Sequence, residues 1–82
     1  MRTEQDVLND FEKLGYKVVC NSENELVLEE RFSYWVDRLH IIKTIKKYAK
    51  KQWFSNKESF VQGVDIQEHK LLNELFQIWG WF

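Results

Sequence analysis

The chain has 82 residues, of which 44% are hydrophobic and 30% charged, with three glycines and no proline. This length and composition indicate one globular domain, residues 1–82, large enough to fold without metal or disulfide support. The lone Cys20 excludes an intrachain disulfide, and no apolar run approaches the roughly 18 residues of a membrane span. Because the N-terminus also lacks the apolar segment of a signal peptide, we expect a cytoplasmic protein that does not act at a membrane.

The net charge of −1 conceals an uneven distribution. Residues 1–37 carry four basic and nine acidic side chains, and residues 58–82 carry one basic and four acidic. Residues 38–57 between them carry seven basic side chains and no acidic one. A basic segment between two acidic flanks is a charge pattern that can mark an interaction site.

The first predicted element is a helix from Thr3 to Leu14. Thr3 is the expected N-cap, and the acidic side chains that follow lie at the positive end of the helix dipole. Gly15 stands where a left-handed residue ends a helix, which predicts that Tyr16 folds back onto Phe11. The apolar stripe of this helix consists of Val7, Leu8, Phe11 and Leu14.

The next fifteen residues predict a hairpin. Residues 16–20 are rich in β-branched and aromatic side chains, residues 21–24 are polar, and residues 25–30 contain the apolar run Leu26-Val27-Leu28. Glu29 and Glu30 are adjacent on the second strand, so they point to opposite faces of the sheet. They therefore cannot form a catalytic pair of carboxylates.

Residues 31–54 fit two patterns, and neither is clean. A helix over residues 33–53 gives an apolar stripe through Trp35, Leu39 and Trp53, but Lys46 interrupts it. A hairpin with strands 39–44 and 49–54 places a Lys-rich turn between two strands that are not well patterned. The residues alone favour the helix slightly.

The last predicted element is a helix within residues 64–82. Asp65 and Glu68 have the spacing of a capping box. Gly80 is expected to end the helix, with Trp81 folded back onto Phe76. The predicted apolar face, which we expect to cover a small core, consists of Leu71, Leu72, Leu75, Phe76, Ile78 and Trp79.

Three stretches, 11–16 (FEKLGY), 64–72 (VDIQEHKLL) and 79–81 (WGW), together resemble small uncharacterised proteins of phages and prophages of Gram-positive bacteria. Those chains open with a helix ending in Leu-Gly-Tyr, continue through a few strands, and close with a helix ending in Leu-Gly-Trp. Here Trp79 replaces the usual leucine, and the middle of the chain is unusually basic. The resemblance implies a phage or prophage origin and favours strands on both sides of a Lys-rich turn, but it carries over no functional residues.

The sequence offers little for catalysis. It contains no Gly-rich phosphate loop, no His-Glu-x-x-His and no Cys-x-x-Cys, and Cys20 has no base near it in the sequence. His40 and His69 lie on different predicted elements. We therefore expect no catalytic residue, no metal site, no cofactor and no enzymatic activity.

Binding is the better-supported class of function. Lysines alternating with rings over residues 43–54 can contact phosphates and stack on bases, or dock on an acidic protein surface. The plain alternative is that these lysines pair with carboxylates on neighbouring strands or are solvated. The predicted pI near 6.1 disfavours simple duplex binding. The candidate binding residues are Lys43, Lys46, Lys47, Lys50, Lys51, Tyr34, Trp35 and Trp53.

The sequence therefore predicts an α+β domain: an N-terminal helix, an antiparallel sheet of three or four strands, and a C-terminal helix, with both helices on one sheet face. The expected function is that of a phage-encoded accessory protein in the host cytoplasm. It would bind a host macromolecule, most simply a host protein, without catalysis, as an inhibitor of a host defence system does. The alternatives are binding of nucleic acid or a nucleotide through residues 43–51, and a homo-oligomeric structural protein.

Overall fold

The computed structural model describes residues 2–54, 57–61 and 64–82, without the side chains of residues 59–61. Over these residues the chain forms two helices and five strands and belongs to the α+β class, as predicted. In chain order the elements are α1 (Glu4–Lys13), β1 (Lys17–Asn21), β2 (Glu25–Arg31), β3 (Trp35–Ile42), β4 (Lys47–Phe54), β5 (Lys57–Val61) and α2 (Ile66–Ile78).

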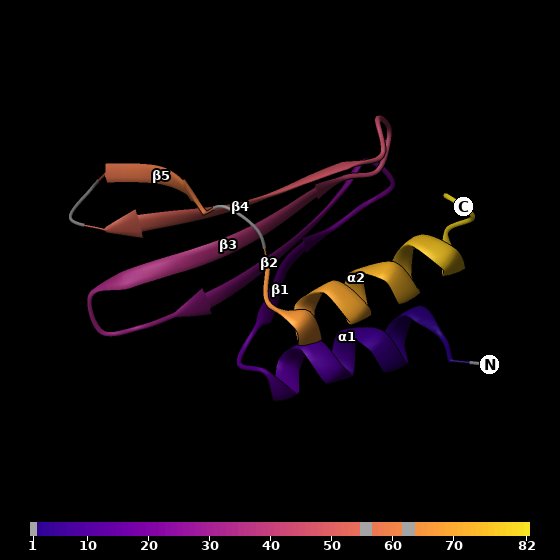
Figure 1. Ribbon diagram of the computed structural model, residues 1–82, viewed down its shortest axis with the longest axis horizontal. Coiled ribbons are helices and arrows are strands. Elements are labelled where there is room, and N and C mark those ends of the chain that lie inside the picture. The colour runs from indigo at the N-terminus through magenta and orange to yellow at the C-terminus, as the bar shows by residue number, and fades with distance from the viewer. Residues whose placement is uncertain (1, 55–56, 62–63) are drawn as a thin grey trace.

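The sheet is an antiparallel meander in which every strand pairs with its neighbours in sequence, in the order β1-β2-β3-β4-β5. Both helices lie side by side against one face of it, and the other face is left uncovered (Figure 1). We call these the helix-side face and the open face. Cross-strand partners share a face, so Leu28, Leu39 and Lys50 belong to the helix-side face, whereas Val27, His40 and Ala49 belong to the open face.

Both helices begin with the predicted N-caps. Thr3 accepts a hydrogen bond from the backbone N–H of Asp6, and the Asp6 carboxylate accepts one from the Thr3 N–H. In α2, Asp65 and Glu68 form the same reciprocal pair, at 2.9 and 3.2 Å. Each pair satisfies donors that the first turn of a helix leaves without an intrahelical partner, which is why the helices begin at these residues.

Both helices also end as predicted. Gly15 and Gly80 have φ angles of 106° and 75°, a region that favours glycine. The N–H of Tyr16 then reaches the Phe11 carbonyl at 3.1 Å, and the two rings pack edge to face. At the other helix the N–H of Trp81 reaches the Phe76 carbonyl at 2.8 Å, and these two rings stack 4.3 Å apart.

The middle of the chain is a hairpin, so the alternative of a central helix over residues 33–53 is wrong. β3 and β4 pair over their full lengths, from Trp35 opposite Phe54 to Ile42 opposite Lys47. The turn occupies residues 43–46, so it is centred two residues earlier in the chain than predicted. Its last residue, Lys46, adopts a left-handed conformation with φ of 55°. β3 consequently begins four residues earlier than the predicted strand.

The fifth strand was not predicted. β5 pairs with β4 through contacts that run from Lys57 opposite Phe54 to Val61 opposite Lys50. Its sequence begins with three polar residues and shows no alternation of apolar and polar side chains. This strand is therefore defined by its hydrogen bonds to β4 and not by its side-chain pattern.

The core lies between the helices and one half of the sheet. Its buried residues are Val7, Leu8, Phe11, Tyr16, Leu26, Leu28, Leu39, Ile41, Leu71, Leu72, Leu75 and Phe76. Trp79, predicted to be a core residue, is only half-buried at the edge of this cluster, where its indole N–H donates to Glu4 at 2.9 Å. The ends of β3, β4 and β5 extend beyond the helices, so that part of the sheet lacks a covering layer (Figure 1).

Candidate binding surface

The Lys-rich segment does not form one continuous surface, because alternate residues of a strand point to opposite faces. Lys50 belongs to the helix-side face, opposite Leu39, whereas Lys47 and Lys51 belong to the open face, opposite Ile42 and Arg38. The remaining two candidate lysines, at positions 43 and 46, lie in the turn between β3 and β4. Residues adjacent in sequence are therefore divided among three environments.

Lys50 is held inside the molecule. Its ammonium group lies 3.0 and 3.2 Å from the two carboxylate oxygens of Glu68 and 5.9 Å from the centre of the Tyr16 ring. The Tyr16 hydroxyl donates to the same Glu68 carboxylate, and burial together with this hydrogen bond raises the pKa of Tyr16. Lys50 therefore ties β4 to the first turn of α2, a structural role.

Two further carboxylates face the helices beside this pair. Glu30 and Asp37 are cross-strand neighbours, and Gln52 donates a hydrogen bond to Asp37 at 3.0 Å. Burial raises the pKa of Glu30. The Lys50 ammonium partly opposes that rise, and the carboxylates of Asp37 and Glu68 add to it. The helix-side face thus changes from apolar to acidic where the helix cover ends.

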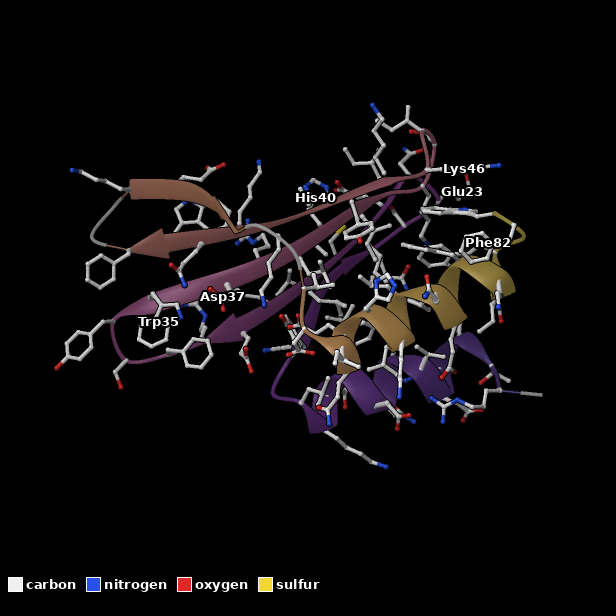
Figure 2. All side chains as sticks on the ribbon, viewed as in Figure 1. Glu23, Trp35, Asp37, His40, Lys46 and Phe82 are labelled. Carbon is white, nitrogen blue, oxygen red and sulfur yellow. The ribbon has the colours of Figure 1, made fainter. Side chains whose placement is uncertain are left out.

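Lys43 is also committed to the fold. Its ammonium group donates to the Asn21 side chain at 3.0 Å and to the Ser22 carbonyl at 2.7 Å, and it lies 4.9 Å from the centre of the Trp79 ring. It thereby joins the β1–β2 turn to the end of α2. Lys46 is exposed at the tip of the next turn, at the opposite end of the molecule from Trp35 (Figure 2).

On the open face, basic side chains lie beside carboxylates. Glu29 accepts from Arg38 and contacts Arg31, each at 2.7 Å, and these guanidinium groups lower the pKa of Glu29. Lys51 lies 3.1 Å from Glu58. Lys51 thus pairs with a carboxylate of β5. Glu25 and Glu29, two of the three acids of β2 that could have paired with the lysines, instead contact His40 and the two arginines.

His40 and Cys20 share one carboxylate on that face. The Glu25 carboxylate lies 2.7 Å from His40 Nε2 and accepts a weak hydrogen bond from the Cys20 thiol at 3.5 Å. His40 lowers the pKa of Glu25, whereas desolvation and then the carboxylate raise the pKa of Cys20. A thiol with a raised pKa stays protonated, and the thiolate is the reactive form. Among the described residues, no group of three or more His, Cys, Asp or Glu side chains could hold a metal ion.

The other candidate residues gather at the end of the sheet that the helices do not reach. Tyr34 lies in the β2–β3 connection, Trp35 begins β3, and Trp53 lies near the end of β4. Phe32 and Phe54 join them, because Phe32 stacks on Trp35 at 4.5 Å and Phe54 is the cross-strand partner of Trp35. We call these five residues the aromatic end.

The rings of the aromatic end are largely accessible. Tyr34 is 78% exposed, Phe54 55% and Phe32 40%, while the two tryptophans are half-buried. A depression of about 360 Å³ lies among Phe32, Tyr34, Trp35 and Trp53. Arg38 lies 5.0 Å from the centre of the Trp53 ring, which adds a planar cation beside the aromatic side chains. The aromatic end therefore presents exposed rings and a hollow at the end of the sheet, with Trp35 and Phe54 on the helix-side face and Trp53, beside Arg38, on the open face.

Comparison with known proteins gives no match to this chain among family models, curated proteins or solved structures. In the described part of the chain, neither helix has the length and apolar character needed to span a membrane.

The sequence groups Phe32 with Tyr34 and Trp35, and Phe54 with Trp53, but the predicted candidate set includes only Tyr34, Trp35 and Trp53. The signal that could have found Phe54 is the hairpin register. With the turn at residues 43–46, Ile42 pairs with Lys47. Continuing this antiparallel pairing along both strands places Trp35 opposite Phe54. The stacking of Phe32 on Trp35 depends on the β2–β3 connection, whose conformation no simple sequence pattern specifies.

Proposed function

We propose that this protein acts without catalysis, by binding another protein through the aromatic end. The observation that supports this is the exposure of Phe32, Tyr34 and Phe54 together at a point where the sheet has no covering layer. Contiguous exposed rings are rare on monomeric proteins and mark interaction sites. Aromatic residues and arginine are also the side chains that contribute most to binding energy at protein interfaces.

The charges around the aromatic end favour a protein over a nucleic acid. Arg31 and Arg38 both contact Glu29, and Lys51 lies beside Glu58, so carboxylates offset these cations. A polyanion gains affinity from cations that can neutralise its phosphates, and each carboxylate nearby reduces that gain. A protein surface of mixed polarity has no such requirement.

The aromatic end is also organised before it binds. The backbone N–H of Phe32 donates to the Trp35 carbonyl at 2.9 Å, which closes the turn between β2 and β3, and the two rings stack. Side chains fixed in this way lose little conformational entropy on binding. This supports a surface used for recognition rather than a chance exposure of apolar residues.

The resemblance to phage and prophage proteins suggests where the partner is found. It supports the proposal that the protein is a phage-encoded accessory factor whose target is a host protein, such as a component of a host defence system. The end of the sheet would then cover a functional surface of that target. This part of the proposal rests on the sequence resemblance alone.

Site-specific photo-crosslinking tests the proposal. A benzophenone amino acid replaces Tyr34, and the protein is expressed in a Gram-positive host, irradiated, and purified after nuclease treatment. We expect a defined protein adduct that is lost when Phe32 and Phe54 are changed to serine. The matched control places the same amino acid at Ile66, which is 75% exposed on α2, away from the aromatic end.

Each other outcome contradicts the proposal in a recognisable way. An adduct that disappears on nuclease treatment identifies nucleic acid as the ligand. An adduct between two copies of this chain identifies a homo-oligomer. Equal adducts from positions 34 and 66, or none from position 34, show that the aromatic end is not the binding surface.

A further inference from the structure

A second hollow lies on the open face, away from the aromatic end. It is a groove of about 270 Å³ along β3 and β4. Ala49 lies between Lys47 and Lys51 on β4, and Ile42 and Ile45 add apolar side chains at the turn end of the groove. The groove therefore combines a small apolar centre with a cation at each end of its β4 side.

Two features of the sequence create this groove. Alternate residues of β4 place Lys47, Ala49 and Lys51 in one row, and alanine leaves a gap between the two long side chains. The cross-strand partner of Ala49 is His40, whose ring contacts Glu25 on β2 at 2.7 Å, away from β4. Among the described residues, the space above Ala49 is thus left open between the two lysines and toward β3.

The spacing of the row matches that of an extended peptide. Side chains at i, i+2 and i+4 of a strand share one face and repeat about every 6.6 Å, so Lys47 and Lys51 begin about 13 Å apart along β4. An extended peptide laid along the groove presents its own alternate side chains with the same repeat. An aliphatic side chain over Ala49 would then place the residues two before and two after it over the two lysines.

We propose that this groove binds an extended segment of a partner protein with the pattern acid-x-aliphatic-x-acid. The aliphatic side chain would occupy the gap at Ala49, and the two carboxylates would pair with Lys47 and Lys51. This groove shares no residue with the aromatic end, so the inference stands or fails independently of the function proposed above.

Neighbouring charges favour such a segment over a nucleic acid. The carboxylate of Glu58 already lies 3.1 Å from Lys51, and Glu25 lies beside His40 at the β3 side. A continuous run of phosphates would meet both carboxylates, whereas the proposed segment meets Glu58 beside Lys51 but places an uncharged side chain at the centre, near Glu25 and His40. Ala49 at the centre and Ile42 and Ile45 at the turn end suit an aliphatic side chain and offer nothing to a phosphate.

The test uses three capped synthetic peptides, titrated into the full-length protein and followed by amide NMR shifts. Their central sequences are Glu-Ser-Leu-Ser-Glu, Gln-Ser-Leu-Ser-Gln and Glu-Ser-Ser-Ser-Glu. We expect the first to shift the amides of His40 and Ala49 with saturation. The second and third should bind at least several-fold more weakly, because each lacks one of the two complementary features.

Four single variants assign the contacts. Lys47→Gln should weaken the first peptide by up to about fivefold, the range of one exposed ion pair. Ala49→Leu fills the gap and should abolish binding, and an unchanged melting temperature would show that the fold is retained. Glu58→Gln removes the carboxylate beside Lys51 and should strengthen binding. Lys17→Gln, which removes the same charge from exposed β1 outside the groove, should have no effect.

The inference is overturned if the first peptide causes no shifts in the groove, or binds Ala49→Leu as well as it binds the wild type. It is also overturned if a single-stranded thymidine oligonucleotide binds more tightly than the peptide and loses affinity in Lys47→Gln. In that case the groove would be a nucleic-acid site.

Discussion

The two halves of the sheet share β2, β3 and β4 but perform different tasks. Under the helices, Leu26, Leu28, Leu39 and Ile41 are fully buried, whereas at the aromatic end even the large rings remain exposed or half-buried. The change is visible along β3, where the helix-side residues run from Ile41 and Leu39 through Asp37 to Trp35. Apolar area contributes to stability only where a second layer covers it, so the rings beyond the helices are available for binding.

The largest expected difference in stability is between two variants that each lose one aromatic ring, one from each half of the sheet. Phe11→Ala removes a fully buried ring from the core and should lower the free energy of unfolding by about 3–5 kcal/mol. Tyr34→Ala removes an exposed ring and should change it by less than about 0.5 kcal/mol. Urea unfolding of both variants measures the difference. A comparable loss in Tyr34→Ala would mean that the aromatic end is part of the stabilising core.

The lysines of the basic segment provide the next contrast. Lys50→Met leaves Glu68 buried without its cation and should cost about 3 kcal/mol, the lower range for breaking a buried ion pair. Lys47→Met makes the same change on the open face, where Lys47 is exposed, and should be close to neutral. Thermal unfolding of the two variants under the same conditions compares them. Equal losses would contradict the division of the segment between two faces.

Alanine substitutions at the two cap glycines distinguish the cost of left-handed backbone strain from the cost of a steric contact. Gly80→Ala introduces only the strain of a left-handed alanine, about 1 kcal/mol, because no other atom lies within 4 Å of the new Cβ. Gly15→Ala adds a contact, since its Cβ would lie 2.6 Å from the Glu30 carboxylate. We expect the larger loss of stability at Gly15. Combining Gly15→Ala with Glu30→Ala should remove the excess.

The smallest expected effect lies at the border between the halves. Because burial raises the pKa of Glu30 in the folded state, its stabilising contribution is present at low pH, where the group is protonated, and is lost as pH rises through the folded-state pKa. The ionised carboxylate therefore destabilises the fold at neutral pH. Glu30→Gln should raise the melting temperature at pH 7 and have little effect near pH 3. A variant that is less stable than wild type at pH 7 would show that the carboxylate makes a favourable contact.

Local signals were sufficient to predict the helices. The capping boxes and the glycine ends depend on residues within six positions of one another, so Thr3, Gly15, Asp65 and Gly80 could be assigned without knowing the fold. The hairpin of residues 35–54 was ambiguous because β4 has a largely buried lysine, Lys50, on one face and two more accessible lysines, Lys47 and Lys51, on the other. β5 was not predicted because its pairing with β4 defines it as a strand, and its own side-chain pattern does not indicate one.

The candidate surface could be predicted only in part. Tyr34, Trp35 and Trp53 were identified by residue type, but the structure was needed to bring them together with Phe32 and Phe54. The role of Lys50 depends on Glu68, 18 residues later in the chain, and on Tyr16, which precedes β1. No local pattern reveals such contacts, because the arrangement of the helices over the sheet creates them.

The most direct test of the central claim measures stability and binding on one variant. Phe32, Tyr34 and Phe54 are changed together to serine, and urea unfolding is measured alongside pull-down, without a crosslinker, of the partner that photo-crosslinking identifies. Our account predicts that the free energy of unfolding falls by less than about 1 kcal/mol, while capture falls at least tenfold. A large loss of stability, or full capture by the folded triple variant, would contradict the account.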